Sequence, residues 1–179
     1  ENRTQSVFDN GHEMAYKYDH SGERVIKRGP QGETAYVNQY FSVRNRQIGT
    51  KHIYAGTTRI VSKLMKQNAF EKDQFYLHAD HLGSNTYITN ADGEVYRHTE
   101  FFPSGEAWID EASNTQRTPY LFSGKELDEE TGLYYFGARY YDPRTAAWQS
   151  PDPAAETYLD GGGTGGVYDS ANLSLYRYA

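Results

Sequence analysis

The chain lacks cysteine altogether among its 179 residues. Disulfides, thiolate nucleophiles and cysteine-based zinc sites are therefore excluded. Apolar residues are also scarce, at 37%, and no apolar run approaches the length of a membrane-spanning helix. Basic residues are outnumbered, and the net charge of −6 argues against nucleic-acid binding as the main function.

A conventional N-terminus is missing as well, because the sequence opens with Glu1 and no signal-peptide pattern follows. We therefore expect the chain to be a piece of a longer polypeptide. Its length fits one domain.

Tyrosine and glycine are abundant, with 17 of each. Tyrosine combines a large apolar ring with a polar tip and is enriched in strands, while glycine favours tight turns. This composition is typical of a β protein with many turns, and a compact helical domain would look different.

Short strand-turn-strand units recur along the first two thirds of the chain. Residues 14–28 turn at 19–22, and the runs 52–64 and 75–89 turn at Gly56 and at 80–84. Later turns are expected at 92–93 and at 103–105, and residues 110–118 read as a polar loop. The recurrence predicts an array of hairpins that stack into one extended sheet.

The segment 120–149 is the densest in aromatic residues. Residues 126–131 are interpreted as a turn or one helical turn that Gly132 ends, and the acidic residues in it as solvated. The EF-hand spacing that would indicate calcium is missing. Two tyrosine-rich strands are expected next, at 133–136 and 138–141.

Three segments resemble the bacterial Rhs/YD-repeat proteins. The run YKYDHSGERV is similar to one YD repeat, and FYLHADHLGSNTYITNADGEVYRHTEFFPSGEAW resembles the run that precedes the Rhs core. The run FSGKELDEETGLYYFGARYYDPRTAAWQSPDP, residues 122–153, is very close to the Rhs repeat-associated core motif. Rhs proteins and Tc-toxin C components are polymorphic toxins in this family, and teneurins use a similar shell.

This resemblance implies an all-β fold, in which YD-repeat hairpins form part of a hollow β-shell with an irregular C-terminal plug. Three parts are expected: shell strands at 1–118, the core motif at 119–153, and the truncated start of the plug and autoprotease segment at 154–179. A one-layer shell has no two-layer core, so we expect ladders of tyrosines to hold it together. The candidate tyrosines are Tyr16, Tyr18, Tyr134, Tyr135, Tyr140 and Tyr141.

The resemblance also implies two catalytic residues, Asp152 and Arg139. The family's core resembles an aspartyl autoprotease, in which two carboxylates share the acid and base roles. Asp152 lies in the family's Ser-Pro-Asp-Pro run and Arg139 in its Gly-Ala-Arg-Tyr-Tyr-Asp run, whereas the second aspartate is expected beyond residue 179. The alternative is a buried ion pair with a structural role only. We expect this chain alone to be inactive.

His78, Asp80 and His81 allow two interpretations, a metal site or a hairpin turn. The turn is favoured, and no metal and no cofactor are expected.

The function implied is the structural end of a toxin-encapsulating shell, which takes part in self-cleavage within the full parent chain. The implied partners are the rest of the shell, a C-terminal toxin domain, and secretion-machinery or Tc-toxin subunits, with export or delivery by a bacterial secretion system. An adhesion or carbohydrate-binding module of the teneurin type is the alternative, and an independent hydrolase ranks last.

Overall fold

The structure is a computed structural model that describes residues 3–9, 11–65, 74–113, 118–159, 166 and 170–178. It is dominated by antiparallel strands, which confirms the all-β prediction. The elements are β1 (Ser6–Asp9), β2 (His12–Tyr18), β3 (Arg24–Gly29), β4 (Gly32–Asn38), β5 (Phe41–Arg44), β6 (Ile48–Ala55), β7 (Thr58–Met65), β8 (Gln74–Ala79), β9 (Asn85–Thr89), β10 (Val95–Phe101), β11 (Ala107–Ala112), η1 (Phe122–Gly124), β12 (Glu126–Asp128), β13 (Leu133–Tyr135), β14 (Tyr140–Asp142), β15 (Ala147–Trp148), α1 (Ala155–Leu159) and η3 (Ser170–Leu173).

The first eleven strands form one long sheet in which every strand pairs with its neighbours in the sequence. All pairings are antiparallel, as in β6 and β7, where His52 lies opposite Ser62. Strands β1 and β11 are the two edges of this sheet, and each has one strand neighbour among the described residues. The predicted hairpin array is therefore confirmed.

Three hairpins have turns with the same hydrogen-bond pattern. This pattern explains why aspartate, asparagine and glycine residues in the sequence could be used to predict the turns. Asp19, Asp80 and Asn90 each accept hydrogen bonds at Oδ1 from the backbone N–H groups two and four residues later, at 2.8–3.0 Å. Glycine follows three residues after each of them, with φ of +82° to +84°. Side-chain capping and a left-handed glycine thus fix the turn together.

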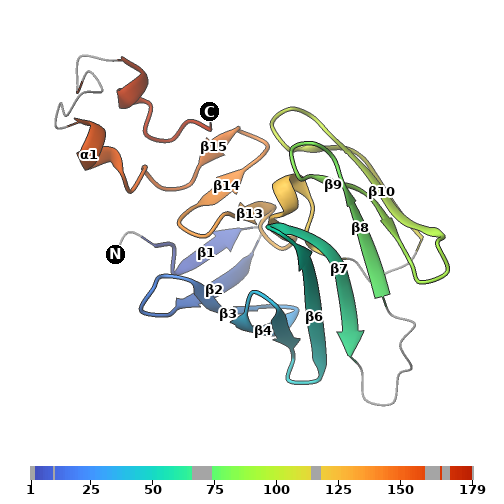
Figure 1. Cartoon of the computed structure of the whole chain (residues 1–179). Coiled ribbons are helices and arrows are strands. Elements are labelled where there is room, and N and C mark those ends of the chain that lie inside the picture. The colour runs from blue at the N-terminus through green and yellow to red at the C-terminus, as the bar shows by residue number, and fades with distance from the viewer. Residues whose placement is uncertain are drawn as a thin grey trace.

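A second, four-stranded sheet of β12 to β15 follows in the order of the sequence. Figure 1 shows the long sheet curving around η1 and this short sheet, so the two sheets lie as layers. Met14 and Tyr16 of β2 pack against Leu133 and Tyr140 from the short sheet in one core cluster. The core motif thus adds an inner layer to part of the wall, and the rings of Tyr16 and Tyr140, with centroids 4.9 Å apart, make contact between the two layers.

Two local expectations also need correction. Residues 110–112, expected in a loop, continue β11, while 114–117 lie outside the described residues. The acidic run begins with strand β12 rather than a solvated turn, because Glu126 and Asp128 face buried cations. The turn comes only after Asp128 and ends at Gly132, with φ of +71°.

The C-terminal part contains little regular structure. Helix α1 is five residues long, and Arg177 forms an isolated bridge with Ala147 that brings the end of the chain to β15. The 3-10 helix η3 precedes that bridge. In the described part of the chain, no helix has the length and apolarity needed to cross a bilayer. The predicted boundaries at 118 and 153 stay a prediction.

Candidate functional site

The two residues expected to act together, Arg139 and Asp152, form an ion pair. Arg139 lies in the loop between β13 and β14, and Asp152 follows β15. The Arg139 Nη2 atom is 3.2 Å from the Asp152 Oδ2 atom, with side chains 17% and 28% exposed. The other Asp152 oxygen accepts a hydrogen bond from the Ala154 N–H at 2.9 Å, so the carboxylate is fixed from two sides.

Aromatic rings hold the arginine of this pair in place. The Arg139 guanidinium carbon lies 4.1 Å from the centre of the Trp148 ring, in cation–π range. Trp148 in turn packs edge-on to Phe136 and against Tyr178, with ring centroids 5.1 and 5.3 Å apart. The Nη1 atom of Arg139 is buried without a hydrogen-bond partner. Arg139 therefore has one nitrogen paired with Asp152 and one buried nitrogen that forms no hydrogen bond with the described residues.

The chemistry available to this pair alone is limited. Hydrolysis by carboxylates needs one group as acid and another as base. In the described part of the chain, Asp152 is the only carboxylate that forms an ion pair with Arg139. The geometry brings the two predicted residues together, and it suits both the catalytic and the structural interpretation.

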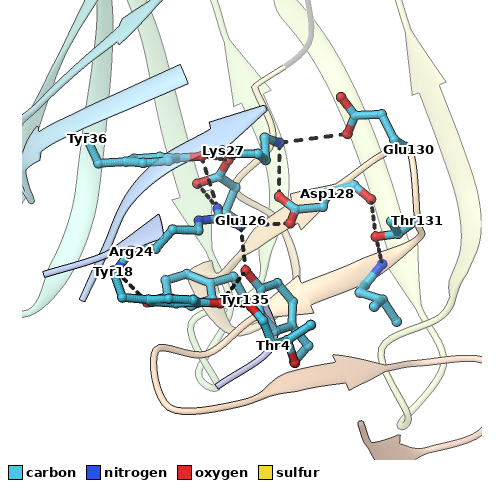
Figure 2. A network of polar contacts seen from close by, with 12 residues as sticks. Thr4, Tyr18, Arg24, Lys27, Tyr36, Glu126, Asp128, Glu130, Thr131 and Tyr135 are labelled. Carbon is cyan, nitrogen blue, oxygen red and sulfur yellow. Dashed lines mark hydrogen bonds and ion pairs between the residues drawn. The ribbon is translucent and has the colours of Figure 1, made fainter. Parts of the chain in front are cut away.

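A buried network of charges lies between the long sheet and the short sheet (Figure 2). Arg24 of β3 places Nη1 2.7 Å from Asp128 and Nη2 3.0 Å from Glu126, both in β12. Lys27, also in β3, lies 2.9 Å from Asp128 and 3.4 Å from Glu126. The Tyr36 hydroxyl donates to Glu126 at 2.6 Å. Two strands that are about a hundred residues apart in sequence are thereby joined.

Burial makes this network energetically demanding. The side chains of Arg24 and Asp128 are 1% and 0% exposed. Burial alone would lower the pKa of Arg24, but Glu126 and Asp128 outweigh it and raise that pKa well above its usual value. Burial alone would likewise raise the pKa of Glu126, yet Arg24 and Lys27 lower it. Arg24 and Glu126 therefore stay charged at neutral pH.

Tyrosine rings complete the surroundings of Arg24. Its guanidinium carbon lies 4.3 Å from the centre of the Tyr135 ring and 4.9 Å from that of Tyr36. The Tyr140 hydroxyl accepts a hydrogen bond from Arg24 Nη1 at 3.2 Å, and the Tyr135 hydroxyl accepts one from the Arg24 backbone N–H at 2.9 Å. The arginine of the YD-like repeat is thus enclosed by residues of the core motif.

Sequence reasoning missed this network. The signal that could have found it is the alternation in Glu126-Leu127-Asp128, which puts both carboxylates on one face of a strand. That face needs cations, and Arg24 and Lys27 of β3 both reach it, because the pairing of β3 with β2 has a register shift between Arg24 and Ile26. Only the three-dimensional arrangement shows that the two sets meet.

His78 lies in strand β8, and Asp80 and His81 lie in the hairpin turn that follows it. Asp80 Oδ1 accepts from the backbone N–H groups of Leu82 and Ser84 at 2.8 Å each. His78 Nε2 lies 3.0 Å from Thr89 Oγ1 on the neighbouring strand. Asp80 is thus occupied by the backbone, as the turn interpretation predicts.

Comparison with known proteins gives a consistent family. The sequence model of the protein family described as Teneurin YD-shell matches residues 4–179 of this chain. The tRNA3(Ser)-specific nuclease WapA of Bacillus spizizenii is 29% identical over 171 residues, which is 91% of this chain and 7% of that protein. Toxin subunit YenC2 of Yersinia entomophaga is 37% identical over 116 residues, 63% of this chain and 10% of that protein.

Solved structures show the same fold. The crystal structure of TcdB2-TccC3-Cdc42 superimposes with a TM-score of 0.75 at 24% identity, and it covers 97% of this chain and 9% of that chain. The present chain thus spans 7% to 10% of the length of the two relatives described above.

Proposed function

Because the chain belongs to the Teneurin YD-shell family, we propose that it forms one end of a toxin-encapsulating shell. In this proposal β1 to β11 are a stretch of wall, and residues 118–148 turn inward and close the container. The observation that carries the proposal is the buried network, because Arg24 and Lys27 of the wall fix β12 of the inner layer.

The relatives support a scaffold rather than an enzyme in this segment. One relative is named as a tRNA nuclease and matches 91% of this chain, and another is named as a toxin subunit and matches 63% of it. A segment shared by proteins of different named activities does not supply those activities. The nuclease or toxin activity would then reside in other parts of those longer chains.

The partners follow from the geometry of the long sheet. Among the described residues strand β1 pairs with β2 alone, so its other side is an edge of the sheet, and such an edge accepts a further strand. The rest of the shell would add there, and a C-terminal toxin domain would occupy the enclosed space. Secretion-machinery or Tc-toxin subunits would then deliver the complex outside the cell.

Self-cleavage is the second part of the proposal. Asp152 would act as one of two carboxylates that hydrolyse the bond before the toxin domain, and Arg139 would position it. The supporting observations are the 3.2 Å ion pair and the unpaired, buried Nη1 atom of Arg139, which can bind the acceptor that the continuing chain brings.

The test uses the full-length parent protein with Asp152→Asn, which keeps the shape of the side chain but cannot ionise. Release of the downstream domain, followed by gel electrophoresis, should stop while the shell still assembles. The matched control is Asp142→Asn, because Asp142 also pairs with an arginine of the core motif, Arg144, at 2.9 Å. The control should still be cleaved. Normal cleavage of the Asp152→Asn protein would refute the catalytic role, and loss of cleavage in both variants would show a structural effect.

A further inference from the structure

Residues 174–178, the return segment, come back to the short sheet and lie beside strand β15. The Tyr176 carbonyl accepts a hydrogen bond from the Trp148 N–H at 2.8 Å. The Leu175 carbonyl accepts one from the Asp152 N–H at 3.1 Å. Backbone contacts thus join the return segment both to β15 and to the residue that pairs with Arg139.

Tyr178 anchors the return segment in a core cluster of the inner layer. Its ring centroid lies 4.3 Å from that of Tyr141 and 5.3 Å from that of Trp148. The rings of Phe136 and Phe122 lie 6.0 and 6.2 Å away. Tyr178 therefore packs among rings from η1, β14, β15 and the loop after β13.

The rest of the return segment is held more weakly. Ser174, Tyr176 and Arg177 are exposed, and Leu175 is half-buried. Tyr178 is the one residue of the segment that packs against a core cluster of the described residues. Exposed backbone hydrogen bonds add little net stability because water competes for them, and ordering a chain segment costs conformational entropy. The position of the segment therefore depends mainly on the Tyr178 ring.

The return segment reaches Asp152 directly and Arg139 through one aromatic ring. Leu175 binds the backbone of Asp152, whose Oδ2 atom is 3.2 Å from Arg139 Nη2. The Arg139 guanidinium packs against the Trp148 ring at 4.1 Å, and that ring also contacts Tyr178. Loss of the anchor would release the Asp152 backbone and loosen the ring against which Arg139 packs.

We propose that Tyr178 is a positioning residue for self-cleavage, because its ring anchors the return segment and the segment holds Asp152 at Arg139. This inference rests on the self-cleavage proposed above. The role belongs to the ring rather than to the hydroxyl, so phenylalanine should be able to replace tyrosine here. Hydrolysis is sensitive to such positioning, since a displacement of about 1 Å in a reacting group can slow a reaction about a hundredfold.

The test measures the rate at which the full-length parent releases its downstream domain, followed by gel. Tyr178→Ala should slow release at least about tenfold, whereas Tyr178→Phe should release at close to the unchanged rate. Tyr176→Ala is the matched control within the return segment, because Tyr176 is 52% exposed and its backbone carbonyl remains in the variant. This control should also release at the unchanged rate.

Phe101→Ala separates positioning from a general loss of stability. Phe101, in β10, packs against Phe122 of the same core cluster, with ring centroids 5.8 Å apart. Its removal should lower the unfolding midpoint but leave release faster than in Tyr178→Ala. Hydrogen–deuterium exchange of residues 147–153 adds a readout that does not need cleavage. Exchange there should be faster in Tyr178→Ala and unchanged in Tyr178→Phe, and unchanged exchange in Tyr178→Ala would overturn the anchoring role.

The outcomes separate this inference from the proposal on which it rests. Normal cleavage of the Asp152→Asn protein would refute self-cleavage by this pair, and the role of Tyr178 in it would fall as well. If Asp152→Asn blocks cleavage, normal release from Tyr178→Ala would overturn the role of Tyr178 alone, as would equal slowing by Tyr178→Ala and Phe101→Ala. If Tyr178→Ala does not fold, Tyr178→Leu takes its place, and release as fast as that of Tyr178→Phe would then contradict the proposal.

Discussion

Replacement of Arg24 by alanine should destabilise the fold far more than the same change at Arg28. Both arginines lie on strand β3 and both pair with carboxylates. They differ in burial, because the Arg24 side chain is 1% exposed and that of Arg28 is 59% exposed. The pair thus compares a buried and an exposed ion pair within one strand.

The expected magnitudes follow from what each change leaves behind. Arg24→Ala leaves Asp128 and Glu126 buried with Lys27 as their remaining cation, and breaking a buried pair from one side costs about 3–5 kcal/mol of unfolding free energy. Arg28→Ala leaves a carboxylate that water can solvate, and such exposed pairs contribute about 0–1 kcal/mol. The difference between the two variants should therefore be about 3 kcal/mol.

Urea unfolding of the full chain, followed by tyrosine and tryptophan fluorescence, measures both values. A third variant isolates the electrostatic part, since Arg24→Met with Asp128→Asn removes one cation and one anion together. It should recover part of the stability lost in Arg24→Ala, because less uncompensated charge remains buried. Equal midpoints for Arg24→Ala and Arg28→Ala would refute the reasoning, and the network would then add nothing to stability.

Three further predictions concern pH, a glycine and an aromatic ring. Burial lowers the pKa of His52 to about 3 in the folded chain, against about 6.5 when unfolded, so the unfolded state binds more protons between these values. Stability should therefore fall as the pH is lowered through this range, by about 2 kcal/mol at about pH 5. A His52→Gln protein should lose less stability over the same range in urea titrations. Gly105→Ala should lower the thermal unfolding temperature more than Gly56→Ala does. Both glycines have positive φ, but only at Gly105 would an added Cβ contact the Phe122 ring, at 2.5 Å. Equal unfolding temperatures for the two variants would contradict this. In the full-length parent, Trp148→Leu should slow release of the downstream domain, as judged by gel, whereas Trp148→Phe should release it faster than Trp148→Leu. The reason is that an aromatic ring at this position packs against the Arg139 guanidinium. Equal rates for the two variants would exclude that role.

The hairpins could be predicted from the sequence because their signals are local. Asp19, Asp80 and Asn90 each cap a turn within four residues, and the glycine of the same turn lies three residues on. Nothing distant is needed to place such a turn. The all-β class and the strand order of the wall follow from their repetition.

The inner layer could not be predicted in this way, because its partners are remote. Arg24 and Asp128 are 104 residues apart, and Lys27 and Asp128 are 101 apart. An acidic run near a glycine usually indicates a solvated turn, and tertiary contacts overrode that pattern here. The pairing of Arg139 with Asp152 came from the family motif, since neither residue by itself indicates a partner.

The strand order of the long sheet also determines the order in which parts of the chain can fold during synthesis. Every strand of β1 to β11 pairs with the strand synthesised just before or after it, so the wall has low contact order. Its strands can therefore pair one after another as the chain leaves the ribosome. Residues 118–148 are made afterwards, and their anchors on β3 and β9 must already be in place. Docking of the inner layer therefore depends on β3 and β9 being folded, and any chemistry that depends on this layer is delayed until then.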